Sequence, residues 1–156
     1  MNIFQSGLAL LLLTGLAVPV HAQYDEADRA GASAMKQLKL LDHADGGLRY
    51  WLAKSAERAE LDERQVRLIG NLLKGWRTYT SMECDLIGDV TGGSSASKSV
   101  YTSLCENSRY IARIRIVNKV KSCLIRVLRK SEHETLYAST CIELLTPLKT
   151  KNDYIG

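Results

Sequence analysis

The residues with the most distinctive chemistry in this sequence are its four cysteines, Cys84, Cys105, Cys123 and Cys141. A cysteine can ligate a metal, act as a nucleophile or oxidise to a disulfide. Metal sites draw on closely spaced ligand pairs, and these four residues are widely separated along the chain. Their even number instead favours two disulfides formed in an oxidising compartment. Three pairings are open, and we predict the sequential one, Cys84–Cys105 with Cys123–Cys141, because it closes the shortest loops.

Other candidate chemistry in the sequence is sparse. The segment Glu132-His133-Glu134 has residue types that transfer protons, but a charged helix start explains it as well. Glu83, Asp85 and Asp89 carry carboxylates suited to a cation, although a calcium loop has denser ligands. No phosphate-binding loop, serine-hydrolase elbow or zinc-protease motif occurs. We therefore expect a protein that is not an enzyme and that holds neither a metal nor a cofactor.

The first 22 residues contain no Lys, Arg, Asp or Glu and include the apolar run GLALLLLTGLAVPV, which ends at Val20. The small residues Val20 and Ala22 suit a signal peptidase, so we predict a cleaved signal peptide over residues 1–22. A membrane anchor is the alternative, but the run is short for a span of about 20 residues. The mature chain would then be residues 23–156, periplasmic or secreted, without a membrane span.

That mature chain has the length of one domain, and its apolar residues recur at helical spacing. Helical patterns cover residues 24–43, 48–61, 61 to about 84, 101–128 and 132–149. Asp45-Gly46-Gly47 looks like a stop signal between the first two, and a break near Asn118 is expected. A strand over residues 111–120 is the alternative there, because that stretch alternates. We predict an all-α fold, a small disulfide-stapled bundle of about four to five helices.

One motif joins the third and fourth helical patterns, over roughly residues 74–113. Its residues are Trp76, Tyr79, Cys84, Gly92, Gly93, Ser94, Cys105 and Arg113. In residue types and spacing it resembles the lysozyme inhibitor LprI-like N-terminal family, a group of small exported helical domains. The sequence differs from the family where Thr80 and Ser81 stand in place of an Arg-Asp pair. The resemblance implies a helical fold and an exported binding protein, with lysozyme inhibition known for few such domains.

Between the first two cysteines lies a stretch rich in glycine and serine, Gly88–Ser99. We expect a loop whose ends are held together by Cys84–Cys105, with Trp76 and Tyr79 buried beneath it. A plain exposed connector is one interpretation. The other is a presented loop that contacts a partner, in which case the contact residues are Asp85, Asp89, Gly92, Gly93 and Ser94.

The charge is unevenly distributed in a chain whose formal net charge is +4. Lys and Arg dominate residues 105–130, whereas residues 57–63 and 83–89 are rich in acids. The basic segment is either a solvated helix face or a surface for an anionic partner; nucleic acid is not expected for an exported chain. Lysozymes are commonly cationic, so an inhibitor would need a local acidic surface.

These observations lead to one functional hypothesis with two alternatives. The first is an exported binding protein that inhibits a lysozyme or another wall-degrading enzyme. The alternatives are a periplasmic immunity protein against a delivered toxin, and a structural envelope-associated module that uses its basic helical face for peripheral contact.

Overall fold

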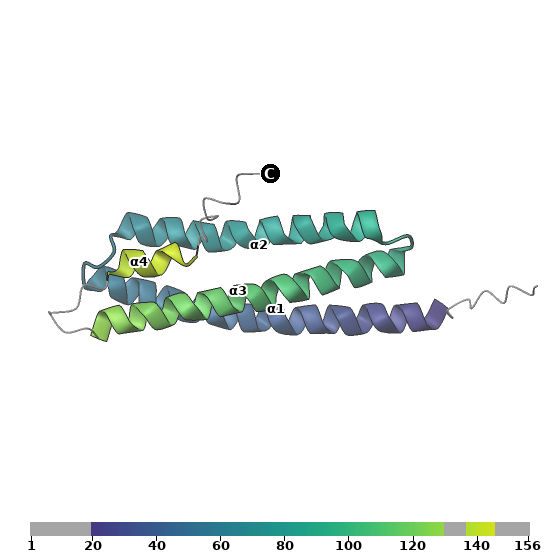
Figure 1. Cartoon of the computed structure of the whole chain (residues 1–156), viewed down its shortest axis with the longest axis horizontal. Coiled ribbons are helices and arrows are strands. Elements are labelled where there is room, and N and C mark those ends of the chain that lie inside the picture. Colours follow the sequence, from purple (N-terminus) through teal and green to yellow (C-terminus); the bar gives the residue numbers. More distant parts are fainter. Residues whose placement is uncertain (1–19, 130–136, 146–156) are drawn as a thin grey trace, which may run out of the picture.

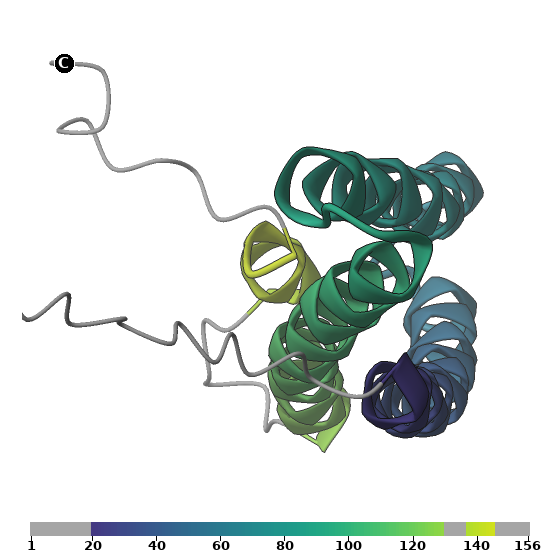
Figure 2. The same cartoon turned by 90° about the vertical axis from the view of Figure 1, so that its right-hand side faces the viewer.

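The computed structural model describes residues 20–129 and 137–145, and these form four helices and no strand. Three long helices follow one another, α1 (Val20–Glu57), α2 (Glu63–Thr91) and α3 (Ser95–Arg129), and the short α4 (Ala138–Glu143) packs at one end (Figure 1). α3 lies against both α1 and α2, which make few contacts with each other (Figure 2). The predicted all-α bundle stapled by disulfides is therefore confirmed.

Two expected helix breaks are absent. α1 continues through Gly46 and Gly47 to Glu57, so the predicted stop signal is wrong. Two glycines in a helix cost about 1 kcal/mol each relative to alanine, but Leu41, Leu48 and Leu52 are all buried on one face of this helix. Packing of that face against α3 outweighs the weak local preference. α3 likewise runs without a break at Asn118 and without a strand over residues 111–120.

The connection between α1 and α2 is tight and fully capped. The Glu60 backbone N–H donates to Ser55 O at 2.9 Å, and Ala59 takes a left-handed conformation with φ of 56°. Asp62 then caps α2: the Gln65 backbone N–H donates to its carboxylate at 2.7 Å, and the Asp62 N–H donates to the Gln65 side chain at 2.8 Å. This reciprocal pair of bonds fixes where α2 begins.

The connection between α2 and α3 is much shorter than the loop we predicted over Gly88–Ser99. α2 continues to Thr91 and α3 begins at Ser95, so the prediction of a long presented loop is wrong. The glycines serve a close approach of the two helices instead, because a Cβ on Gly88 would overlap Thr102 Oγ1 and one on Gly92 would overlap Lys98 N. Ser94 accepts a bond from the Ser97 N–H at 3.2 Å and so caps the start of α3.

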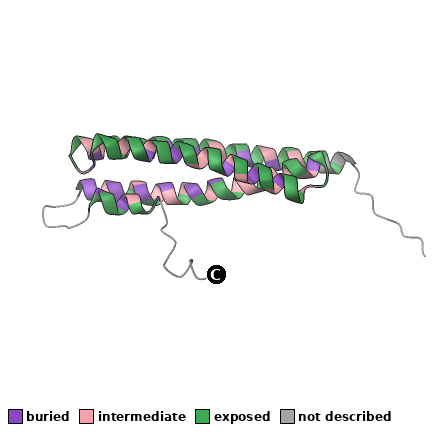
Figure 3. Ribbon diagram, turned by 90° about the horizontal axis from the view of Figure 1, so that it is seen from above, coloured by how far each residue is buried: buried purple, intermediate pink, exposed green. Residues whose placement is uncertain are grey.

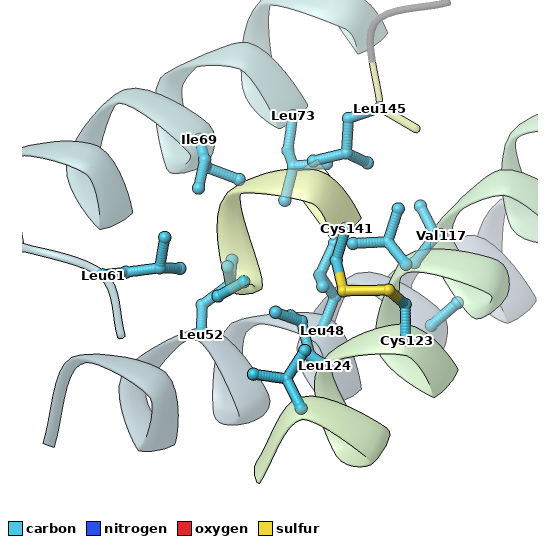
Figure 4. Packing of buried hydrophobic residues seen from close by; sticks show 14 of the residues in the cluster. Leu48, Leu52, Leu61, Ile69, Leu73, Val117, Cys123, Leu124, Cys141 and Leu145 are labelled. Atoms are coloured by element: carbon cyan, nitrogen blue, oxygen red, sulfur yellow. A yellow bond between two sulfur atoms is a disulfide. The ribbon is translucent and has the colours of Figure 1, made fainter. Parts of the chain in front are cut away.

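The main core lies at the end of the bundle that holds α4. Buried side chains line the inward faces of the long helices (Figure 3), and α4 closes the cluster over them (Figure 4). Its members are Leu41, Ala44, Leu48, Leu52, Leu61, Ile69, Leu73, Tyr110, Val117, Val120, Cys123, Leu124, Val127, Ala138, Cys141 and Leu145. The Cys123–Cys141 disulfide lies inside this cluster and holds α4 on α3.

Both predicted disulfides are confirmed, Cys84–Cys105 and Cys123–Cys141. Of the helix predicted over residues 132–149, the structure describes residues 137–145, of which Ala138–Glu143 form α4; the other residues of that segment lie outside the described part, as do residues 1–19 of the predicted signal peptide. The boundaries at residues 22 and 23 therefore stay predictions. Among the described helices, none combines the length and apolar character needed to cross a membrane.

Two glycines in α2 should respond to alanine in opposite ways. Gly88→Ala should lower the free energy of unfolding by about 1–3 kcal/mol, because the new methyl group overlaps α3. A Cβ on Gly75 meets nothing within 4 Å, so Gly75→Ala should raise it by up to about 1 kcal/mol through helix propensity alone. Urea denaturation of both variants measures this, and equal effects would contradict the close helix approach at Gly88.

Candidate functional site

The end of the molecule formed by the second half of α2 and the first half of α3 gathers most of the predicted site residues. We call residues 78–110 the hairpin end. Cys84 and Cys105 join the two helices there, with Cα atoms 5.5 Å apart, and Cys84 is fully buried. The predicted bracing of this region is thus confirmed, but it holds two helices together rather than the ends of a loop.

Tyr79 does not lie in the core, where we predicted it. Its side chain is 65% exposed, and Trp76 is only partly buried against the core. The inward face of α2 passes through Leu73, Thr80 and Cys84. Successive residues of a helix are about 100° apart, so Tyr79 is turned away from the face that Thr80 occupies. The apolar residues of α2 therefore form two faces at helical spacing, an inner one and an outer one, and the prediction that Tyr79 is buried is wrong.

The second of these faces is exposed along most of α2, and we call it the outer face of α2. Its six apolar side chains are Leu68, Leu72, Tyr79, Met82, Leu86 and Val90. They follow one another at steps of three, four or seven residues, which keeps them on one side of the helix. Val90 is 76% exposed, and all six side chains stay exposed although α2 packs against α3 along another side. A row of exposed apolar side chains of this kind is typical of an interaction site.

Apolar side chains also project from the α3 side of the hairpin end. Tyr101 and Leu104 are 42% and 51% exposed. They lie on the helix that Cys105 joins to α2, so the hairpin end carries exposed apolar groups on both of its helices.

The hairpin end is acidic although the whole chain is basic. Its charged residues are four acids, Glu83, Asp85, Asp89 and Glu106, and two bases, Lys98 and Arg109. Glu83 accepts a bond from Arg109 at 2.7 Å, and Asp89 pairs with Lys98. Burial raises the pKa of Glu106, and the nearby charge of Asp85 adds to the increase. Asp85 is exposed and makes no ion pair within the described part of the chain, so it carries uncompensated negative charge at the surface.

The predicted partner-binding residues therefore come together at one end, with different environments. Asp85, Asp89, Gly93 and Ser94 are exposed, whereas Gly92 is half-buried against Lys98. Gly92 and Ser94 already have structural roles in the turn. The exposed surface beside them comes from the side chains of α2, which the sequence analysis did not identify.

Arg113, the last residue of the motif, is buried beneath the hairpin end. Its guanidinium lies 5.1 Å from the centre of the Trp76 ring and donates to Leu145 O at 3.2 Å. Burial lowers its pKa because the charged form loses contact with water. The contacts connect α3 to α2 and to the chain after α4. They also shrink the basic surface predicted over residues 105–130, because Arg113 is inside and Arg109 is paired.

The acid–base segment Glu132-His133-Glu134 lies outside the described residues. Within residues 20–129 and 137–145, no three His, Cys, Asp or Glu side chains are placed to share a metal ion. Comparison of the chain with protein-family models, with curated proteins and with solved structures found no match in any of the three. The LprI-like resemblance is therefore neither supported nor opposed by a relative.

Tyr110 provides a test of how the hairpin end is held on the core. Burial, together with the charge and hydrogen bond of Glu106, raises the pKa of Tyr110 to about 12 from 10.0. The neutral phenol is therefore favoured by folding. Its contribution to the free energy of unfolding is complete below pH 10.0 and is lost as the pH rises through about 12.

We expect Tyr110→Phe to flatten the loss of stability between about pH 10 and 12, since phenylalanine has no proton to lose. Urea denaturation at a series of pH values measures the slope, and Tyr79→Phe, which alters an exposed ring, is the control. An unchanged slope in Tyr110→Phe would show that this phenol is not the group that titrates.

Proposed function

We propose that this chain is an exported binding protein that presents its hairpin end to a protein partner. The observation that carries the proposal is the outer face of α2, where six apolar side chains are exposed in the described part of the chain. An exposed apolar surface lowers the solubility of a protein. These side chains take no part in the core, because another face of α2 packs on α3. A partner that buries these side chains gives them a purpose.

The charge of the hairpin end favours a cationic partner. Four carboxylates against two cations leave a local acidic surplus, and Asp85 is free to meet a positive group outside the chain. Complementary charge increases the rate of association and aligns the partners. Together with the LprI-like motif, this leads us to propose a lysozyme or another wall-degrading enzyme as the partner, with the inhibition of its activity as the function.

Rigidity supports the same proposal. Cys84–Cys105 fixes two helices that are joined by only Gly92-Gly93-Ser94. A surface held in place before binding loses less conformational entropy when the complex forms. Two disulfides also fit an oxidising compartment, which agrees with the predicted signal peptide and with a periplasmic or secreted location.

The first test removes apolar surface from the hairpin end. Stoichiometric excess of the chain should slow the clearing of a cell-wall suspension by at least one member of a panel of lysozymes. Leu86→Ser with Val90→Ser should weaken that inhibition by about tenfold or more, since each buried apolar side chain contributes about 1 kcal/mol or more to an interface.

Met35→Ser with Leu40→Ser is the matched control, because it removes two side chains of α1 that are 54% and 48% exposed. It should leave inhibition unchanged. No inhibition across the panel would reject the lysozyme proposal, and equal loss in both variants would remove the hairpin end as its site. Light scattering of the chain alone shows whether a second copy covers the outer face instead.

The second test concerns charge. Asp85→Asn should slow association with the inhibited enzyme and reduce the dependence of the association rate on salt, while dissociation changes little. Glu143→Gln makes the same change of charge on α4, at the other end of the bundle (Figure 1), and should leave the rate unaltered. Stopped-flow fluorescence measures both, and equal slowing would mean that the whole-chain charge acts rather than Asp85.

A further inference from the structure

A second feature lies away from the hairpin end, between α1 and α2. Because these two helices make few contacts with each other, an open cleft of about 740 Å³ separates them. Gly46 on α1 and Gly70 on α2 line it, and a Cβ on Gly46 would meet nothing within 4 Å. Side chains at these two positions would fill part of the space that the glycines leave open.

The charged groups of the cleft divide into two sets. At one end, Arg77 bridges two acids of α1: it pairs with Asp42, and its Nη2 lies 2.8 Å from Asp45 Oδ2. Asp45 is almost fully buried, and these hydrogen bonds raise the pKa of Arg77 against the opposing effect of burial. The two acids of the cleft are thereby occupied with a cation of the same chain.

The other set is cationic, and none of its members pairs with a buried acid of the described chain. Arg49, Arg67 and Lys74 line the cleft, and neither Arg49 nor Lys74 makes an ion pair among the described residues. Arg67 has only a long contact of 3.5 Å with Glu63, in which both side chains are mostly exposed. The Arg49 guanidinium reaches across to α2, since its Nη1 would lie 3.4 Å from a Cβ on Gly70.

From this arrangement we propose that the cleft between α1 and α2 binds a phosphate group. Arg49 and Lys74 are two positive charges from opposite walls, and a phosphate dianion neutralises both. A guanidinium matches phosphate oxygens with two parallel hydrogen bonds, and lysine adds a mobile point charge. The acids near Arg77 repel the anion and so confine it to the Arg49 end of the cleft. The volume leaves room for the molecule that carries the phosphate.

The cleft lies between α1 and α2, and it meets the outer face of α2 only where Lys74 and Asn71 border Tyr79 and Met82. The proposed function is tested at Leu86, Val90 and Asp85, which do not line the cleft, so the two proposals can fail independently. The first experiment titrates pyrophosphate into the whole chain by calorimetry at low salt. We expect saturable binding of one pyrophosphate per chain. Arg49→Gln with Lys74→Gln should reduce the affinity at least tenfold.

Arg115→Gln with Lys119→Gln is the matched control. It removes the same charge from exposed positions on α3 and should change the affinity less than twofold. Gly70→Leu keeps every charge but places a side chain against Arg49, so it should also reduce the affinity. Leucine favours a helix more than glycine does, so this variant is expected to remain folded, and circular dichroism checks that.

Vesicles distinguish the two sources of phosphate. Co-sedimentation with phosphatidylcholine vesicles that contain phosphatidic acid tests a lipid headgroup, and calorimetry tests a free phosphate compound. Binding in either assay supports the proposal and names the source if Arg49→Gln with Lys74→Gln abolishes it and Arg115→Gln with Lys119→Gln preserves it. No binding in either assay, or equal loss in both pairs of variants, would overturn it.

Discussion

The arrangement of this protein depends on α3 being covered from two sides. Its buried residues cover a broad side of the helix, because Tyr110, Val117 and Leu124 recur every seven residues on one stripe, and Val120, Cys123 and Val127 form a second stripe beside it. α1 and α2 therefore pack on α3 rather than on each other. Two consequences follow from this single constraint: the cleft between α1 and α2 stays open, and the outer face of α2 is left exposed by the helices of the described residues.

The second requirement is that a buried cation be accommodated where α3 meets its neighbours. Among residues 20–129 and 137–145, no carboxylate forms a hydrogen bond or ion pair with Arg113, which is held by the Trp76 ring and the backbone carbonyl of Leu145. Burying a charged guanidinium with such partners costs free energy. Contact with the half-buried Trp76 offsets part of that cost. The indole covers a guanidinium, so its value to the fold is partly electrostatic and not only apolar.

Secondary structure could be predicted from the sequence because it depends on the spacing of nearby residues. Disulfide pairing could be predicted because few pairings are possible. Helical spacing indicated the helices, and four cysteines allow only three disulfide pairings. The errors came from expected turns and breaks, at the glycines and at Asn118, and from helix rotation. Gly46-Gly47 and Gly88 are turn signals in isolation, but here packing against α3 keeps them helical. Nothing local distinguished the inner stripe of α2 from its outer one, so Tyr79 was assigned to the wrong side.

The Cys84–Cys105 bond closes the chain into a covalent ring that contains the turn Gly92-Gly93-Ser94. Turns with small polar residues are the usual sites of proteolytic nicking. A single cut in this turn would leave both helices attached to one another through sulfur, with the outer face of α2 still in place. Because the disulfide holds the two helices together, the backbone of the turn need not be continuous. New chain ends could therefore be engineered there while the hairpin stays joined.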